Sequence, residues 1–425
     1  MFNFSIEYLT IDRRGQMDFN GAGEQDLVAF FSLFGTVEDG RIQTEAVQRA
    51  SAELKSNVAA FCDARKAQVP QLGAFRKLVD DLALDEAFLI LPAARSSSAD
   101  RAVLEMLVGW ANGTIREEDA ADFQRFFAPV FAEYELVNPA TDRPNTIGNV
   151  QKARRVCRFC GGSKATGAKF KGNAHAISFG LGNVHLKLAD ECDDCNAVFG
   201  KELEPHLIAL LDIQRVFLGI RGRGADGGLP HAKLRGGEMR HDGERIVIEI
   251  LADAVDHQDG VLSFEVESDV AVIPERCYRT LAKFVLSVVP EAELTRLKAT
   301  VEWVRHGLRP EGRNLPTIYT NVVALEPNSS AQLAVYIRSS ECSHLPHVVG
   351  EFRLGCFVYV LMLPFSDVDE GEPAFFGNER FMATFLHYAG VPGWHGMDFG
   401  SAEPIDGPAV MRLVPRGGPS VNEPE

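Results

Sequence analysis

At 425 residues the chain is longer than one ordinary hydrophobic core supports, which predicts two or three domains. Its 46% hydrophobic and 24% charged residues are typical of a soluble globular protein. The segment from Met1 to Tyr8 lacks the basic start and apolar run of a signal peptide. The longest apolar stretch, Leu354 to Leu363, is about half as long as a membrane span, so it favours a buried strand. We therefore expect a cytoplasmic protein with no membrane partner.

The net charge of −16 is unevenly distributed along the chain. Residues 151–240 contain 15 lysines and arginines against 9 aspartates and glutamates, whereas the remainder contains 28 basic and 50 acidic residues. A basic segment in an acidic chain is consistent with local phosphate contact. Chance fluctuation of charge explains the same counts, so charge alone leaves both interpretations open.

The N-terminal region, residues 1–145, is predicted to be mostly helical. Residues 1–22 alternate apolar and polar side chains and are expected to be extended, and the pattern from there to about residue 136 is helical. The clearest helix begins near Glu117, and its apolar face carries Phe123, Phe126, Phe127, Val130 and Phe131. Pro129 is expected to kink it. No catalytic pattern is present in this region, so we expect a supporting or regulatory domain. Residues 138–150 are predicted to be a linker.

Two Cys-x-x-Cys pairs follow, Cys157/Cys160 and Cys192/Cys195, with 31 residues between them. Two such pairs can supply four thiolates to one tetrahedral zinc ion. Glycines after the first pair ease a tight turn. A redox dithiol is the alternative, but nothing around the pairs resembles a thioredoxin context. The four remaining cysteines stand alone and are expected to be reduced core residues: Cys62, Cys277, Cys342 and Cys356.

Polar residues lie between and just after the cysteine pairs. His175 follows Lys171-Gly172-Asn173-Ala174, Asn183 follows a glycine-rich loop, and Asn196 comes directly after Cys195. A helical stretch then carries Phe199, Leu203, Leu207 and Leu210-Leu211 on its apolar side. The predicted order is strand, loop, strand, knuckle and helix, over residues 151–215.

Residues 216–240 are basic and glycine-rich, from Gly219-Ile220-Arg221-Gly222-Arg223-Gly224 to Gly236-Gly237. They are predicted to be a linker, with a mobile arm that contacts phosphates as the alternative. Residues 241–415 are expected to form an α+β domain, and the tail 416–425 to be disordered. The elements expected in that domain are strands at Arg245–Leu251, Val261–Val266, Thr317–Leu325, Gln332–Ile337 and Cys356–Leu363, a helix at Glu275–Val289, and a second helix from Pro290 to Gly307.

At these residues the sequence resembles the HNH endonuclease family, in its zinc-knuckle subtype of the ββα-metal fold. The resemblance covers Cys157 to His206: two knuckles, a histidine ending the first strand, an asparagine in the loop, and Cys-x-x-Cys-Asn. It implies an α+β multidomain protein with a central nuclease module that hydrolyses phosphodiester bonds in DNA. It implies His175 as general base, Asn183 as the residue that orients it through a loop hydrogen bond, and Asn196 as a ligand of a catalytic divalent ion, Mg²⁺ or Mn²⁺. A role in bacterial restriction or anti-phage defence follows from the resemblance alone.

The chain departs from the family pattern at one position. The family often places Asp, Glu or His directly before the general base as a ligand of the catalytic ion, and this chain has Ala174. Asp194 and Glu204 are the candidate substitutes. The axial separation between Asn196 and Glu204, about 12 Å on one helix, disfavours their sharing an ion. Ala174 also favours the alternative function, a non-catalytic zinc module that binds nucleic acid or holds the flanking domains together.

Other features remain open at this stage. RNA is not excluded as substrate, and an oligomer is possible. Residues Asp190, Glu191, Asp193 and Asp194 are expected to form a solvated acidic cluster. His206 is expected on the surface of the helix. His344 and His347, on either side of Pro346, form a faint metal-binding pattern.

Overall fold

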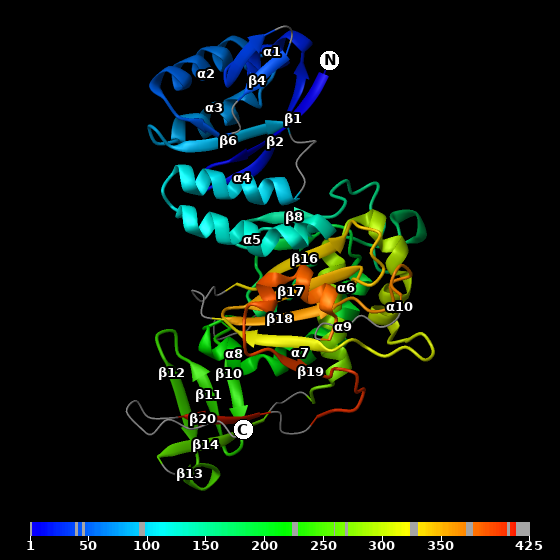
Figure 1. Cartoon of the computed structure of the whole chain (residues 1–425). Coiled ribbons are helices and arrows are strands. Elements are labelled where there is room, and N and C mark those ends of the chain that lie inside the picture. The colour runs from blue at the N-terminus through cyan, green and yellow to red at the C-terminus, as the bar shows by residue number, and fades with distance from the viewer. Residues whose placement is uncertain are drawn as a thin grey trace. The chain divides into compact units, whose positions relative to one another are not determined.

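The computed structural model describes residues 2–38, 41–44, 47–92, 98–222, 228–258, 260–267, 271–323, 330–370, 377–405 and 409–413. It divides the chain into two compact units. One contains Met1–Glu135 and Phe385–His387, and the other contains Leu136–Thr384 and Tyr388–Glu425. Each unit combines helices with sheet (Figure 1), which confirms the expected α+β class. The expected disordered tail, and Arg223-Gly224 of the basic stretch, lie outside the described residues.

The first unit is built on a four-stranded antiparallel sheet of order β2-β1-β6-β5. Its strands are β1 (Phe2–Leu9), β2 (Arg14–Ala22), β3 (Gly35–Glu38), β4 (Arg41–Thr44), β5 (Val47–Arg49) and β6 (Ala87–Pro92). Its helices are α1 (Glu24–Phe31), α2 (Ala52–Arg65), α3 (Leu72–Asp81), α4 (Ser98–Ala111) and α5 (Glu117–Glu133). Strands β3 and β4 form a separate pair.

Aromatic side chains fill the core of this unit. Phe19, Phe30 and Phe75 are fully buried, and the ring centroids of Phe30 and Phe75 lie 5.0 Å apart. The expected extended segment 1–22 is confirmed as the hairpin β1–β2, and the helix expected from Glu117 is α5, which contains Pro129. The sequence pattern missed β6, because this strand is buried on both faces and its apolar run therefore does not alternate.

The second unit contains two larger sheets and a strand pair. Its strands are β7 (Tyr134–Val137), β8 (Asn145–Ile147), β9 (Leu186–Leu188), β10 (His231–Leu234), β11 (Gly237–His241), β12 (Ile246–Ile250), β13 (Asp256–Gln258), β14 (Val261–Glu267), β15 (Ile318–Val322), β16 (Gln332–Arg338), β17 (Val348–Leu354), β18 (Phe357–Met362), β19 (His395–Met397) and β20 (Ala409–Leu413). Its α-helices are α6 (Asp193–Glu202), α7 (Glu204–Leu210), α8 (Asp212–Phe217), α9 (Pro274–Val288), α10 (Lys298–His306), α11 (Glu379–Thr384) and α12 (Leu386–Ala389). Its 3₁₀ helices are η1 (Lys164–Thr166), η2 (Phe179–Leu181), η3 (Ala252–Ala254) and η4 (Glu291–Leu297). The boundary between the units falls within β7 and α12.

The main sheet has the order β19-β15-β18-β17-β16-β7. Helix α9 packs against β16 and β17. A glycine allows this close approach: a Cβ at Gly350 in β17 would lie 2.4 Å from the Val285 Cγ2 atom. Every residue of α9 from Thr280 to Val288 is buried, so protein encloses the second half of this helix on all sides.

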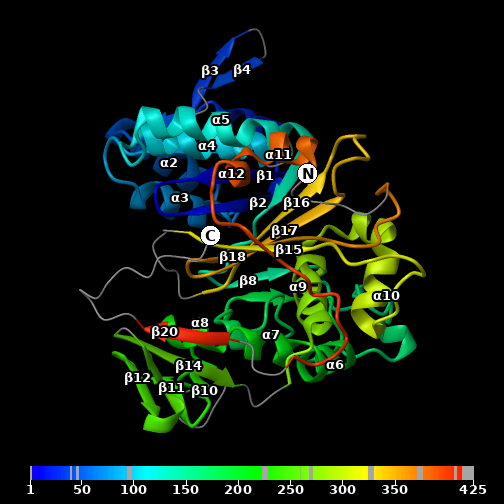
Figure 2. The ribbon, with the colours of Figure 1, turned by 60° about the horizontal axis from the view of Figure 1, so that its bottom comes forward.

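A second sheet has the order β12-β11-β10-β14-β13, and β20 pairs with β14. Figure 2 shows β20, from the end of the chain, alongside β14. Strands β10 and β11 pair from His231↔Arg240 to Leu234↔Gly237. The linker expected over residues 216–240 is therefore wrong in its second half, where Arg235-Gly236 forms the turn of a hairpin and Gly237 begins β11. Likewise β8, in the expected linker 138–150, pairs in parallel with β9.

Most elements expected in residues 241–415 are confirmed. They correspond to β12, β14, α9, α10, β15, β16 and β18. Helix α10 ends at Gly307, whose φ of 72° is the left-handed conformation that favours glycine. Strand β17 was missed. The apolar stretch Leu354–Leu363 contains the end of β17, a turn at Gly355-Cys356 and strand β18.

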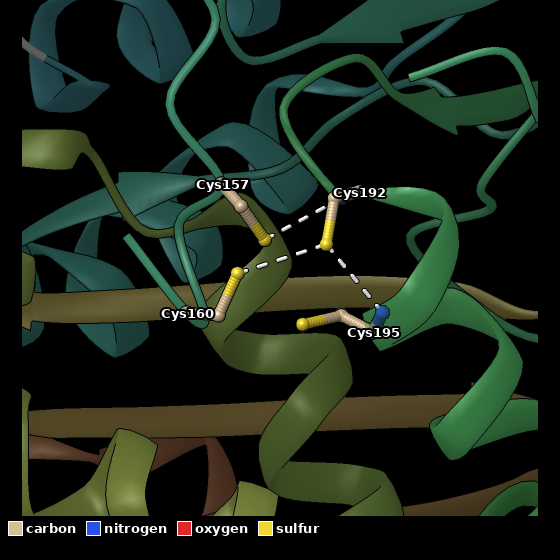
Figure 3. A group of neighbouring side chains, drawn as sticks. All are labelled: Cys157, Cys160, Cys192 and Cys195. Carbon is tan, nitrogen blue, oxygen red and sulfur yellow. Dashed lines mark hydrogen bonds between the residues drawn. The ribbon is translucent and has the colours of Figure 1, made fainter. Parts of the chain in front are cut away.

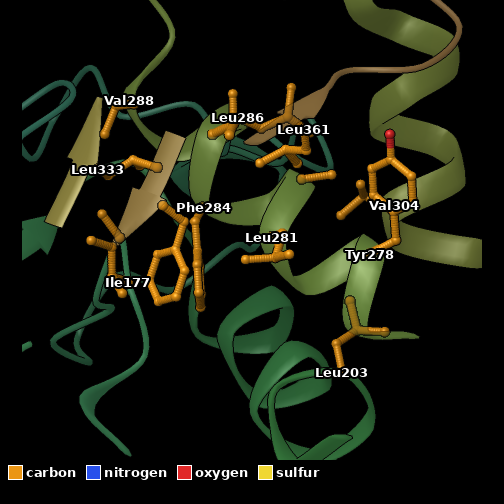
Figure 4. Close-up of a cluster of buried hydrophobic side chains, with 14 of the residues drawn as sticks. Ile177, Leu203, Tyr278, Leu281, Phe284, Leu286, Val288, Val304, Leu333 and Leu361 are labelled. Carbon is orange, nitrogen blue, oxygen red and sulfur yellow. The ribbon is translucent and has the colours of Figure 1, made fainter. Parts of the chain in front are cut away.

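One hydrophobic core joins the cysteine-rich segment to the later part of the chain (Figure 4). Ile177 and Leu203 come from that segment, Leu281 and Phe284 from α9, and Leu333 from β16. Residues 151–215, expected as a module of their own, therefore share their interior with α9, α10 and the main sheet. In the described part of the chain no helix has both the length and the apolar character that crossing a membrane requires.

Candidate metal centre and functional site

The four paired cysteines converge on one point (Figure 3). Their sulfur atoms all lie within 4.8 Å of one another, and the Sγ atoms of Cys160 and Cys192 are 3.7 Å apart. Zinc–sulfur bonds of about 2.3 Å in a tetrahedron place the sulfurs about 3.8 Å apart. Within the described residues this is the one cluster of three or more His, Cys, Asp or Glu side chains close enough to share an ion. The cluster fits a zinc ion, as the sequence predicted.

The first cysteine pair lies in a tight turn. The Gly161 amide donates to the Cys157 carbonyl (2.8 Å), and the Cys157 amide donates to the Gly162 carbonyl (2.8 Å). Gly161 has a φ of 68°, the conformation that glycine adopts without strain. The Gly162 amide approaches the Cys160 sulfur at 3.3 Å, which favours a thiolate there.

The second pair is at the N-terminus of α6. Cys192 is the N-cap residue of that helix, and its sulfur accepts from the Cys195 amide at 3.5 Å. The Cys192 amide in turn donates to the Cys157 sulfur at 3.4 Å. Because the N-terminal end of a helix carries partial positive charge, this placement stabilises the negative charge of metal-bound thiolates.

The thiols strongly perturb one another. A hydrogen bond from the Cys195 thiol lowers the pKa of Cys157 to about 5, and the same bond, together with burial, raises the pKa of Cys195 far above its usual range. Burial raises the pKa of Cys192 to about 11. Four sulfurs this close cannot all be ionised without a cation, so metal binding would displace the retained protons.

His175 lies on the first of two short antiparallel segments that precede α6. It forms an isolated bridge with Lys187, the Ala176 amide donates to the Leu186 carbonyl, and the Leu188 amide donates to the Ala174 carbonyl. A loop that includes η2 connects the segments. The local order is therefore a bridge residue at His175, a loop with η2, strand β9, the second cysteine pair and helix α6.

The His175 ring contacts the loop through its Nδ1 atom. Nδ1 lies 3.0 Å from the backbone oxygen of Asn183. Because a carbonyl oxygen only accepts, Nδ1 must carry the proton and donate. In the neutral imidazole Nε2 then keeps its lone pair, which is the form required of a base. The side chain is half-buried.

The Asn183 side chain holds this loop in place. It is completely buried, and its amide nitrogen donates to the carbonyls of Ile177 (2.7 Å) and Leu186 (3.0 Å). Its side-chain oxygen accepts from the Leu186 amide at 2.9 Å. Asn183 therefore orients His175 through its backbone carbonyl, while its side chain closes the loop.

The predicted ligands of a catalytic ion occupy different surroundings. Asn196 is half-buried in α6, and Asp194 is exposed in the first turn of that helix. Glu204 begins α7, after a break at Leu203, and its Oε1 atom lies 3.4 Å from the Lys283 ammonium. Ala174 is buried. The structure thus directly connects His175 with Asn183, and it connects Glu204 with a lysine.

Two expectations about charged residues are wrong. Asp190 and Glu191 are buried rather than solvated: Asp190 binds Arg158, and Glu191 lies 3.4 Å from Lys283. Of the four acidic residues only Asp194 is exposed, and Asp193 is half-buried. Buried carboxylates occur where a cation compensates their charge. Here the cations are Arg158 and Lys283, and the local sequence pattern does not show that these two residues are buried.

Two buried histidines outside the site, His206 and His347, make structural contacts. His206 is buried, not on the surface: its Nδ1 atom is 2.8 Å from the Ala271 oxygen, and its Nε2 atom is 3.0 Å from the Arg276 guanidinium. The His344/His347 pair formed a faint metal-binding pattern in the sequence, and for His347 the structure gives a different role. The His347 nitrogens contact Ser366 Oγ (2.8 Å) and Glu293 Oε2 (3.1 Å).

Lys283 was missed by the sequence analysis. It is the one charged residue in the run from Thr280 to Val288 of the enclosed helix α9, and its side chain is only 1% exposed. A lysine inside such an apolar run is the signal that was available, since lysine is almost never fully buried unless it is paired.

No family model, no curated protein and no solved structure matches this chain.

Proposed function

We propose that this protein is a metal-dependent endonuclease of the HNH type, in which His175 is the general base. The observation that carries the proposal is the 3.0 Å contact between His175 Nδ1 and the Asn183 carbonyl. That contact selects the tautomer whose Nε2 atom can take a proton from water. It also agrees with the role that the resemblance assigns to the loop asparagine.

The chemistry requires a base and a cation. At neutral pH a histidine near its usual pKa of about 6.5 accepts the proton of the attacking water. A divalent ion, Mg²⁺ or Mn²⁺, would neutralise the negative charge that develops on the phosphate. Asn196 and Asp194 are the candidate ligands that we favour, because Glu204 is already paired with Lys283. The structural zinc ion would hold the two cysteine pairs together beside these residues.

DNA is the substrate that we propose, with RNA as the alternative. Exposed basic residues of the cysteine-rich segment support a nucleic-acid partner: Lys152, Arg154, Lys164, Lys169 and Lys171. Among the residues that the structure describes, none of them forms an ion pair, whereas many surface arginines elsewhere contact a carboxylate. Unpaired cations are available to phosphates. A cytoplasmic role in restriction or anti-phage defence is part of this proposal.

A second candidate function is a non-catalytic zinc module that binds nucleic acid or joins parts of the chain. Ala174 favours it, because a methyl group stands where the family often places an ion ligand, and this methyl group is buried. The shared hydrophobic core also favours it, since the cysteine-rich segment packs against α9. This function requires the zinc ion but not the imidazole of His175.

A plasmid-nicking assay distinguishes the two functions. The natural protein, His175→Ala and the control His231→Ala, whose histidine is exposed on β10, are incubated with supercoiled DNA and Mg²⁺ or Mn²⁺. Loss of the base is expected to slow nicking by roughly 10²- to 10⁴-fold, with zinc content unchanged. Equal nicking by all three proteins, or none by the natural protein, rejects the nuclease. If the natural protein binds DNA without nicking it, retained binding by His175→Ala combined with loss of binding by Cys192→Ser would favour the second function.

A further inference from the structure

Lys283 joins helix α9 to the segment that carries His175. Its Nζ atom donates to the backbone oxygen of His175 at 2.8 Å, across 108 residues of sequence. The same ammonium lies 3.4 Å from Glu191 Oε2 and 3.4 Å from Glu204 Oε1. The shortest of the three contacts is therefore the one to His175.

The charges around this lysine explain why it is buried. Glu191 is completely buried, and neither of its carboxylate oxygens has a hydrogen-bond donor in the structure, so the Lys283 ammonium is its compensating cation. Burial lowers the pKa of Lys283, but Glu191 and Glu204 raise it more strongly, so the net direction is upward and the ammonium stays charged. A charged donor forms a stronger hydrogen bond to a carbonyl than a neutral one does.

Helix α9 is itself held rigidly. Near its C-terminus, Arg158 of the first cysteine turn donates to the carbonyls of Leu286 (2.8 Å) and Ser287 (2.7 Å). In its first half, the Tyr278 hydroxyl donates to the Met362 carbonyl at 2.7 Å. The residues between them pack in the shared core shown in Figure 4. Hydrogen bonds and core packing therefore hold α9, the helix from which the Lys283 side chain extends.

We infer that Lys283 is a positioning residue for His175. The direction of an imidazole depends on where its backbone lies and on how its ring is turned. Lys283 restrains the backbone carbonyl, and the Asn183 carbonyl restrains the ring. The catalytic consequence rests on the proposed function, whereas the restraint on His175 does not.

The test uses the full-length zinc-loaded protein. Lys283→Met alone leaves the buried carboxylate of Glu191 and the half-buried carboxylate of Glu204 without a cation, so the charge-balanced variant Lys283→Met/Glu191→Gln/Glu204→Gln is compared with it. Ser287→Ala is the matched control, because it changes α9 one turn away and removes a hydrogen bond to the Lys283 carbonyl, not to its ammonium. Zinc content and circular dichroism establish that each variant is folded.

The readout is the tautomer of His175, measured by ¹⁵N NMR with histidine-selective labelling and assigned with His175→Gln. The natural protein and Ser287→Ala are expected to show the Nδ1-protonated form. The charge-balanced variant is expected to show a mixture with the Nε2-protonated form, and nicking slowed roughly 10- to 100-fold, since misplacement by about 1 Å has such effects. An unchanged tautomer in that variant overturns the inference.

Two further outcomes are distinguishable. If the natural protein does not nick DNA, the proposed function fails, but the tautomer comparison still decides the role of Lys283. If the substituted proteins do not fold, hydrogen exchange of the Lys283 ammonium in the natural protein tests the inference instead. A buried, hydrogen-bonded ammonium exchanges slowly with water, so Lys283 is expected to give a resolved Nζ proton signal at neutral pH with a through-space contact to His175. Rapid exchange of that signal overturns the inference.

Discussion

The Arg158 guanidinium binds the Asp190 carboxylate through two hydrogen bonds of 3.0 Å, and the two side chains are only 5% and 6% exposed. Arg158 lies between the cysteines of the first pair, and Asp190 lies two residues before the second pair. The third nitrogen of the guanidinium donates to carbonyls at the end of α9. One arginine thus connects both cysteine turns with the helix that carries Lys283.

Replacing one partner of the Arg158–Asp190 ion pair is expected to destabilise the second unit. Asp190→Ala leaves a buried guanidinium without its carboxylate, which costs about 3–5 kcal/mol in the free energy of unfolding. Arg235→Ala is the control, because Arg235 and Glu265 are 62% and 45% exposed and such a pair contributes about 1 kcal/mol or less. Urea unfolding followed by tryptophan fluorescence measures both, in a Trp110→Phe background that leaves the tryptophans of the second unit. Equal losses in the two variants would contradict the structure.

Zinc is expected to be essential for the fold around the cysteine turns. Cys192→Ser removes one of four ligands, so the purified protein should contain much less than one zinc ion per chain and should unfold at a lower temperature. Cys356→Ser replaces a half-buried cysteine outside the cluster and should retain the full metal content. Metal analysis and thermal unfolding provide the comparison. Full zinc retention by Cys192→Ser would exclude the four-cysteine site.

The core beneath the site is expected to respond to a cavity. Phe199 is buried in α6, and its ring lies 4.8 Å from that of Phe159. Phe199→Ala should lower the free energy of unfolding by about 3–5 kcal/mol. Phe217→Ala, at the exposed end of α8, should change it by less than about 1 kcal/mol. Similar effects of both substitutions would show that Phe199 is not a core residue.

Acid is expected to weaken the second unit through His206. Burial, followed by the positive charge of Arg276, lowers the pKa of His206, and the Arg276 guanidinium can only donate to its Nε2 atom. A pKa that is lower in the folded protein means that the unfolded chain binds the proton first. The stability is therefore complete above the unfolded value of about 6.5 and is lost as the pH falls toward the folded value.

The measurement is the free energy of unfolding between pH 8 and pH 5. His206→Gln should lose stability less steeply over this range than the natural protein does. His231→Gln, whose histidine is exposed, should follow the natural protein. A pH profile that His206→Gln leaves unchanged would assign the acid sensitivity to other groups.

Much of the local structure followed from the sequence because its causes are local. Helices α5, α9 and α10 and most later strands are encoded by periodic apolar residues and by end signals such as Gly307. Strand β6 escaped prediction because burial on both faces removes the alternation that marks a strand. The hairpin β10–β11 escaped because its glycines resembled those of a linker.

The sequence by itself predicted the zinc-ligand set, because two Cys-x-x-Cys pairs supply four thiolates, and the structure brings these four sulfurs together. The association of His175 with Asn183 was expected from the family resemblance, and the structure places the two residues in contact across eight positions of one loop. The tertiary structure alone decided that Asp190 and Glu191 are buried, that Arg158 caps α9, and that Lys283 holds the His175 backbone. These contacts join residues more than 100 positions apart or depend on which side chains the shared core encloses. Burial and ion pairing of that kind arise only when the whole unit packs, and no local pattern encodes them.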